Sequence, residues 1–203
     1  MNVCGILRKG QDNACPKSVQ KVYGQEAVFI NTSSFDTIEV DKECTETSSK
    51  YRVKFTLEEG EKGVMFTAPA RSTSIRGWST PVIDDNGLSY YMHHVQIAMT
   101  GISEEQKCIL DALTKGSFAV ALPIVNPVKD DDDFTNSVEI FGIGTGLVST
   151  DGWAYDITEN NGITLIEFSS RENIGEDDLP YMYESAEAGS EMTDFKALFE
   201  NPA

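Results

Sequence analysis

The 203-residue chain contains few of the side chains that build metal centres. It has four cysteines, none of them in a C-x-x-C pair, and only two histidines, the adjacent His93 and His94. On a strand these neighbours would point to opposite faces of the sheet, which makes them a poor shared pair of ligands. We therefore expect no structural zinc and no other metal or cofactor.

Long apolar runs are also missing. The longest nearly uninterrupted one, from Phe118 to Val125, is far short of the roughly 20 residues that a membrane-crossing helix needs. The opening residues 1–15 show no hydrophobic core followed by a cleavage site of small residues, as a signal peptide would. These absences predict a protein that is made and kept in a cytoplasm, where its thiols stay reduced.

Positive charge is scarce, because 16 basic residues oppose 33 acidic ones and leave a net charge of −17. The imbalance is uneven: residues 1–30 carry a net charge of +2, whereas residues 151–203 carry −11. A body this acidic repels nucleic acid instead of binding it. Solubility alone is a sufficient reason for such an excess.

Much of the chain has the two-residue period of β-strands. In residues 51–57, apolar side chains alternate with Arg52 and Lys54, which predicts a half-buried strand with the basic side chains outward. Turn residues at 58–63 lead into another β pattern at 64–68, so these two strands are expected to form a hairpin.

Further strands follow the same reasoning. Residues 88–100 form a long expected strand, with one face made of Tyr91, Val95, Ile97 and Met99. A strand at 118–125 is apolar throughout and should be buried on both faces, with Pro123 at an edge or bulge. Strands at 138–149, 153–160 and 163–170 are expected in meander order, the last two joined by a tight turn at 160–162.

Three glycines stand at alternate positions, Gly142, Gly144 and Gly146. A dinucleotide loop needs G-x-G-x-x-G at the start of a helix, but here the third glycine comes one residue early and strand-like residues follow. The pattern favours a curved or bulged strand, where a missing side chain lets another backbone approach.

Two helices are expected. Ser103 and Gln106 have capping-box spacing, Gly116 ends the helix, and the apolar stripe is Ile109, Leu110 and Leu113. Cys108 lies on this helix and is interpreted as a small core residue. A second, short helix should begin at Glu191 and pack through Phe195, Leu198 and Phe199.

These elements predict a mainly β protein, a two-sheet β-sandwich or barrel of about eight to ten strands with a flanking α-helix and a short C-terminal helix. We expect one domain over 1–203, since the chain is long enough for one well-filled core. Its outlying parts are an N-terminal arm at 1–20, an extended loop or hairpin arm at 69–87, and an acidic C-terminal segment at 170–203.

No catalytic constellation stands out. The acidic run Asp130, Asp131, Asp132 and Asp133 lacks the alternating spacing and turn glycine of a calcium loop, so a solvated loop or charged rim is the better interpretation. No Ser-His-Asp arrangement or nucleophile elbow is present, and carboxylates are so numerous that no pair of them is distinguished. We expect the protein not to be an enzyme.

The order of several features is more specific than any one of them. A short "VCGI" leader precedes a second cysteine and a strand ending "VFIN"; then come a "YYMHHVQIAMT" strand, a Ser-capped helix ending "LTKGSFAVAL", the stretch "VEIFGIGTGL" and a closing "LPYMY". Over nearly the whole chain this succession resembles tail tube subunits of tailed bacteriophages, particularly those of gut bacteria. The leader has a single glycine and the acidic tail is long, so a tail terminator, a neck ring protein or a capsid decoration protein remains open.

The resemblance implies a two-sheet β-sandwich with a flanking helix that assembles with itself into hexameric rings, stacked into a hollow tube through which viral DNA passes without specific binding. Other tail proteins would be its further partners, and the virion tail, assembled in the host bacterial cytoplasm, its location. An acidic lumen would repel DNA from the wall and let it slide. We expect Asp130, Asp131, Asp132 and Asp133 at the lumen or its rim.

Contacts between stacked rings are assigned to the basic leader and the 69–87 excursion. The candidate residues are Arg8, Lys9, Arg76 and Trp78, because Arg and Trp are favoured at interface centres. An ordered surface loop is the alternative for the excursion. A soluble binding or adhesive β-domain that uses its loops for recognition is the alternative for the whole protein.

Overall fold

The computed structural model describes residues 23–45, 48–68, 75–83, 87–100, 103–129, 135–151, 153–155, 162–172, 174–185 and 190–200. Its strands are β1 (Glu26–Asn31), β2 (Phe35–Cys44), β3 (Ser49–Leu57), β4 (Gly63–Thr67), β5 (Arg76–Ile83), β6 (Ser89–Thr100), β7 (Phe118–Lys129), β8 (Thr135–Phe141), β9 (Leu147–Ser149), β10 (Ile163–Ser170), β11 (Tyr181–Tyr183) and β12 (Phe199–Glu200). The helices are α1 (Glu104–Lys115), α2 (Glu191–Ala197) and the short 3-10 turn η2 (Thr32–Ser34). The expected mainly β architecture, with one flanking helix and one short C-terminal helix, is confirmed.

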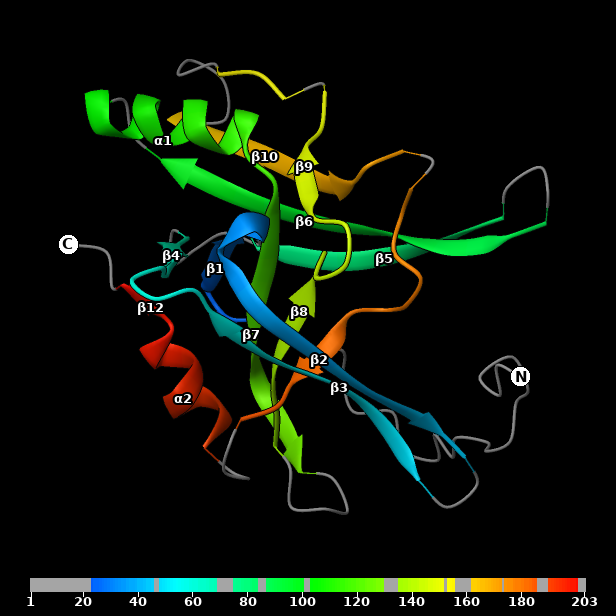
Figure 1. Ribbon diagram of the computed structural model, residues 1–203. Coiled ribbons are helices and arrows are strands. Elements are labelled where there is room, and N and C mark those ends of the chain that lie inside the picture. Colours follow the sequence, from blue (N-terminus) through cyan, green and yellow to red (C-terminus); the bar gives the residue numbers. More distant parts are fainter. Residues whose placement is uncertain are drawn as a thin grey trace.

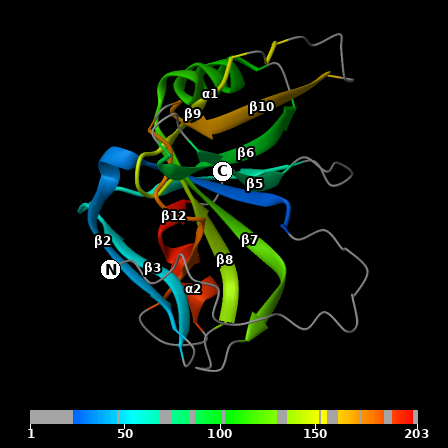
Figure 2. The same ribbon diagram turned by 90° about the vertical axis from the view of Figure 1, so that its right-hand side faces the viewer.

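The strands form one continuous, folded-over sheet instead of two separate ones. Its path runs β2-β3-β11-β8-β7-β9-β10-β6-β5, and β1 joins it by pairing with both β7 and β4. Figures 1 and 2 show how this path bends, so that β5, β6, β9 and β10 lie in an upper part and β2, β3, β7 and β8 in a lower one. The result is a sandwich-like molecule in which strands distant in sequence face each other.

Strands β1 and β7 lie between two hydrophobic cores. Along β1, Ala27 and Phe29 enter the first core while Val28 and Ile30 enter the second. β7 alternates in the same way, so its N-terminal half is buried on both faces as expected. Its register with β8 shifts between Pro123 and Val128, which is the irregularity that the proline predicts.

Helix α1 covers the first core in the upper part of the molecule (Figure 1). Ser103 accepts a hydrogen bond from the Gln106 amide at 3.2 Å, while the Gln106 side chain accepts one from the Ser103 amide at 2.9 Å, so the capping box is confirmed. Leu110 and Leu113 are buried against the core and Ile109 is partly buried. Cys108, expected in the core, is exposed, because it lies on the helix face turned away from this stripe.

Helix α2 closes the second core in the lower part. Phe195 is fully buried there, and Phe199 and the partly buried Leu198 pack with it, as expected. The tyrosines Tyr181 and Tyr183 of β11 complete this core beside the strands. No helix among the described residues is both long enough and apolar enough to cross a membrane.

The expected hairpin between 51–57 and 64–68 is wrong. β4 pairs with β1 and β12, whereas β3 pairs with β2 and β11. The outward assignment of Arg52 is also wrong: this side chain is buried and pairs with Glu184, with 3.5 Å between its Nη1 and a carboxylate oxygen. The C-terminal segment covers a strand that local alternation predicts to be half-exposed.

The expected meander after residue 138 is wrong as well. β8 pairs with β7 and β11, β9 pairs with β10 and β7, and the described residues 153–155 lie outside any strand. The glycine triplet forms a turn between β8 and β9 instead of a bulged strand, with positive φ at Gly142 and Gly146. Gly162 also has positive φ, but residues 160 and 161 of the expected tight turn lie outside the described residues.

The hairpin arm expected at 69–87 is described from residue 75 to 83 and again at 87. β5 pairs antiparallel with β6 from Arg76↔Gln96 to Ile83↔Ser89, so this part is a strand of the main sheet. The long strand at 88–100 is confirmed as β6, with Val95 and Ile97 in the first core and Met99 packed against it. The N-terminal arm at 1–20 lies outside the described residues.

Candidate functional site

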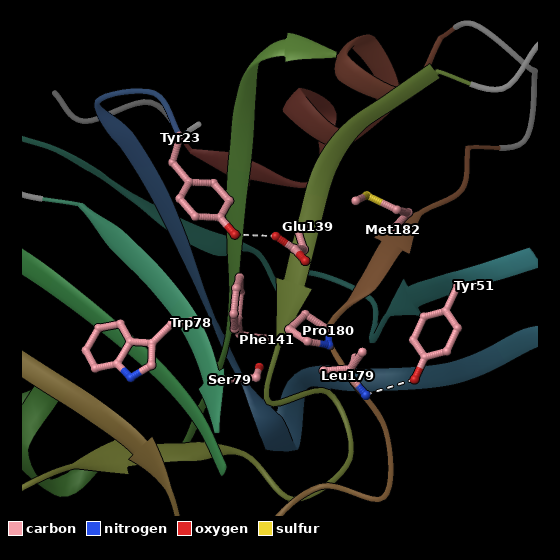
Figure 3. Close-up of a pocket in the computed structure, with 9 residues that line it drawn as sticks. All are labelled: Tyr23, Tyr51, Trp78, Ser79, Glu139, Phe141, Leu179, Pro180 and Met182. Atoms are coloured by element: carbon pink, nitrogen blue, oxygen red, sulfur yellow. Dashed lines mark hydrogen bonds between the residues drawn. The ribbon is translucent and has the colours of Figure 1, made fainter. Parts of the chain in front are cut away.

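A pocket of about 390 Å³ opens between β5, β8 and the segment before β11. Its walls, drawn in Figure 3, are Tyr23, Tyr51, Trp78, Ser79, Glu139, Phe141, Leu179, Pro180 and Met182. β5 is the last strand of the sheet path, and it lies against β8 here, since a Cβ at Gly77 of β5 would come within 2.6 Å of the Phe141 ring. Most of the lining is apolar, and none of the nine side chains is basic.

Glu139 is the only carboxylic acid among the described residues that line this pocket. The Tyr23 hydroxyl donates a hydrogen bond to its Oε2, and the contact is drawn in Figure 3. Burial raises the pKa of Glu139, and the hydrogen bond from Tyr23 opposes that rise. Burial and the nearby carboxylate together raise the pKa of Tyr23, so the phenol remains protonated and keeps donating.

Two further hydroxyl groups line the pocket, and only one of them has a hydrogen-bond partner among the described residues. The Tyr51 hydroxyl accepts a hydrogen bond from the Leu179 amide at 2.8 Å. The Ser79 hydroxyl oxygen is buried and has no hydrogen-bond partner among the described residues. Phe141 packs edge-to-face against Tyr23, with 6.2 Å between ring centroids, and its ring stands between Glu139 and Ser79 in Figure 3.

A second polar cluster lies at the glycine turn, which connects β8 to β9. We call residues 171–180, which connect β10 to β11, the strap. The carboxylate of Glu176 in the strap accepts hydrogen bonds from the Gly144 amide at 3.0 Å, the Thr145 amide at 2.9 Å and the Thr145 hydroxyl at 2.7 Å. Only 4% of Glu176 is exposed, so the glycine turn encloses an anion supplied by the chain itself.

His93 joins the strap to the same turn. Its Nδ1 accepts a hydrogen bond from the Gly142 amide at 3.1 Å, which leaves Nε2 as the protonated nitrogen that donates to the Asp178 carbonyl at 2.8 Å. Burial lowers the pKa of His93 to about 4, so the ring is neutral near pH 7. Asp178 in turn pairs through its carboxylate with Lys42 of β2.

The sequence-predicted interface residues are only partly described. Arg76 and Trp78 lie on β5, where the Arg76 guanidinium stands 5.1 Å from the centre of the Trp78 ring. Trp78 also stacks on His94 at 4.9 Å and contributes to the pocket wall. Arg8 and Lys9, as well as the acidic candidates Asp130, Asp131, Asp132 and Asp133, lie outside the described residues.

Within the described part of the chain, no group of three histidine, cysteine, aspartate or glutamate side chains is placed to hold a metal ion. His93 and His94 do point to opposite faces, since His93 is buried and His94 is half-buried on the other side of β6. No family model, no curated protein and no solved structure matches this chain.

Sequence reasoning missed both acids. Glu139 and Glu176 are two of 33 acidic residues, and nothing in the local sequence marks Glu176 as buried or Glu139 as half-buried. The glycine triplet was the one available signal, because a turn that exposes backbone N–H groups favours an anion. That anion is a carboxylate from 32 residues further along the chain, which no local pattern indicates.

Proposed function

We propose that this chain is a structural subunit of a phage tail tube, which assembles with itself into stacked hexameric rings and has no catalytic role. The observation that carries the proposal is a continuous sheet whose main path has two free ends, at β2 and β5. Among the described residues, β2 pairs only with β3 and β5 pairs only with β6. A free edge at each end allows head-to-tail pairing between copies, which closes into a ring when the rotation between copies permits it.

The exposed side chains of β2 support this interpretation. Ile38 is 43% exposed and Val40 is 49% exposed on this edge strand, and Ile83 on β5 is 74% exposed. Long, flat edges with exposed apolar side chains are an aggregation hazard in a protein that stays monomeric. Pairing with a neighbouring copy removes the hazard.

Net charge supports the tube part of the proposal. An excess of 17 negative charges per chain gives a ring of such subunits a strongly negative field, and an acidic bore repels DNA so that it slides without sticking. The assembled tube would belong to the virion tail, with other tail proteins at its ends. Asp130 to Asp133 remain the predicted lumen or rim residues, and Arg8, Lys9, Arg76 and Trp78 the predicted contacts between rings.

Negative-stain electron microscopy of the purified chain over a concentration series tests the proposal. Stacked hollow tubes are expected. Closed rings that never stack would favour a tail terminator or neck ring protein, and single chains or trimers at every concentration would contradict self-assembly into rings.

Edge variants make this test specific. Replacing Ile38 and Val40 together by Asp places like charges on the β2 edge and should abolish assembly. The matched control is Leu165→Asp, because Leu165 is similarly exposed at 42% but lies on β10, between β9 and β6. Assembly that survives in the β2 variant would overturn pairing through this edge.

A binding or adhesive β-domain is the second candidate, and the pocket at Glu139 is the observation that favours it. It predicts a chain that stays dispersed in the microscope and binds a ligand at that pocket. Sedimentation of the purified protein separates the two candidates without knowledge of the ligand.

A further inference from the structure

The pocket at Glu139 has an unbalanced charge. Its described lining residues include one carboxyl group and no basic side chain. Glu139 is half-buried, and this burial raises the pKa of its carboxyl group because the charged form is less well solvated there than in water. A partly buried carboxylate that no basic side chain of its pocket pairs with is costly, and an entering cation reduces the cost.

One oxygen of this carboxyl group is available. Tyr23 donates to Oε2, and no group among the described residues donates a hydrogen bond to Oε1. The Ser79 hydroxyl, on the other side of the Phe141 ring, is a second polar atom without a partner among them. Both atoms can accept hydrogen bonds, and Oε1 of the ionised carboxylate can only accept, so a donor with a positive charge suits it best.

The walls favour a cation that carries an apolar body. Phe141, Pro180 and Leu179 lie below Glu139 in Figure 3 and Met182 lies to its right, and the pocket volume of about 390 Å³ is at the small end of the range for ligand sites. A bare metal ion is a poor fit, because hard cations require several oxygen ligands and the pocket supplies one carboxylate. An ammonium group on an alkyl chain satisfies both parts of the pocket.

We propose that this pocket binds an alkylammonium group, with the ammonium on Oε1 of Glu139 and the alkyl chain against Phe141, Pro180 and Met182. Such a group is found in free amines and at the end of a lysine side chain. The inference goes beyond the tube proposal and does not depend on it, because it concerns a pocket within a single chain.

Methyl NMR on the full chain labelled with [13C-methyl]methionine tests the inference. Met182 lies in the pocket wall, whereas Met192 packs against the second core and serves as an internal control. Titration with n-butylammonium chloride should shift the Met182 signal saturably and leave Met192 unchanged. 1-Butanol, which has the same chain and no charge, should bind at least about tenfold more weakly because it lacks the charge-assisted hydrogen bond. Met182→Leu assigns the signal.

Two variants that change the net charge by the same amount identify the hydrogen-bond acceptor. Glu139→Gln retains an oxygen for the Tyr23 hydroxyl but removes the charge, and should weaken n-butylammonium binding about tenfold or more. Glu59→Gln makes the same change in net charge on an exposed turn and should bind like the wild type. Equal binding of amine and alcohol, or wild-type affinity in Glu139→Gln, would overturn the proposal.

A dilution series without added amine separates the two sources of the group. A Met182 shift that grows with protein concentration and is absent in Glu139→Gln identifies a lysine side chain of a second copy. A Met182 signal that does not change with protein concentration excludes that lysine, so saturable n-butylammonium binding then assigns the pocket to a free amine. If the wild type assembles under these conditions, the same measurements are made on the double variant Ile38→Asp and Val40→Asp, which should not assemble. Ring formation is read by microscopy, so failure of either proposal leaves the other to be judged separately.

Discussion

Glu176 is buried and Glu139 is half-buried, and the two acids differ in how the chain satisfies them. Three donors from the glycine turn converge on the carboxylate of Glu176, at 2.7 to 3.0 Å. Glu139 has one donor, the Tyr23 hydroxyl, and its second oxygen faces a pocket. The first acid therefore holds the strap in place, whereas the second leaves an unmet interaction that a ligand can meet.

The comparison also explains the glycine triplet. Backbone N–H groups of a tight turn form an anion-binding concavity, as in loops that hold phosphate. Here the strap supplies the anion, and its main chain is fixed as well, because Glu176 and Tyr91 exchange two backbone hydrogen bonds of 2.8 Å. The glycine turn, whose sequence resembles a phosphate-binding loop, thus binds a carboxylate of its own chain.

The largest effect is expected from Glu176→Gln. The amide oxygen can replace Oε1 and accept from Thr145, but the NH₂ group then faces the Gly144 amide, so one buried hydrogen bond is lost and the other two no longer go to a charged group. We expect the free energy of unfolding to fall by about 3 kcal/mol, measured by urea denaturation at pH 7. Glu139→Gln, with the same change of charge, is the matched control, and an equal loss in both variants would remove the distinction between the two acids.

Acid should loosen the strap through His93. Because burial lowers its pKa from 6.5 to about 4, the unfolded chain takes up a proton first as the pH falls. Stability contributed by the neutral ring is complete above about pH 6.5 and is lost progressively toward pH 4, by up to about 3 kcal/mol. Urea denaturation at intervals across this range measures the slope.

The variant His93→Gln should remove this part of the slope, whatever its effect on stability at pH 7. His94→Gln, one residue away on the opposite face of β6, should preserve it. A slope that is unchanged in the first variant and reduced in the second would assign the effect to the wrong histidine and contradict the neutral, doubly bonded ring.

A smaller effect is expected from Gly144→Ala. A Cβ at this position would lie 2.5 Å from Oε2 of Glu176, so the carboxylate must shift within its turn. We expect a loss of about 1–2 kcal/mol in urea denaturation. Gly24→Ala is the control, because its Cβ would meet nothing closer than 3.7 Å. A neutral Gly144→Ala would show that the cradle tolerates a displaced carboxylate.

Elements with a strong local signal could be predicted from the sequence. The capping box at Ser103, the two-sided burial of β7 and the packing of Phe195 depend on neighbouring residues, and the structure confirms all three. Strand partners depend on distant residues. β3 and β4 follow each other in the sequence and have turn residues between them, as a hairpin would. In the structure, β4 pairs with β1 and β3 pairs with β11, so pairing with distant strands replaces the hairpin that the turn predicts.

The candidate site could not be predicted for the same reason. Tyr23 and Glu139 are 116 residues apart and meet because Tyr23 forms a β-bridge with Ile124 of β7, the strand that pairs with β8. Arg52 shows the converse case: alternation places it in solvent, but Glu184 from the C-terminal segment covers it. The residue type of Trp78 predicts an interface anchor, and the structure places this side chain in the pocket wall.

The smallest effect, from Glu139→Gln, is the most informative one. Burial raises the pKa of Glu139, so the stability associated with its protonated form is present in acid and lost as the pH rises through the folded-state pKa. Glutamine does not titrate and still accepts from Tyr23, and we therefore expect a free energy of unfolding at pH 7 within about 1 kcal/mol of the wild type, on the stabilising side. Urea denaturation at pH 7 and in acid should show this difference shrink as the pH falls. A clear destabilisation at pH 7 would mean that the charge of Glu139 is already compensated within the chain, and the pocket would then have no unmet interaction to offer a cation.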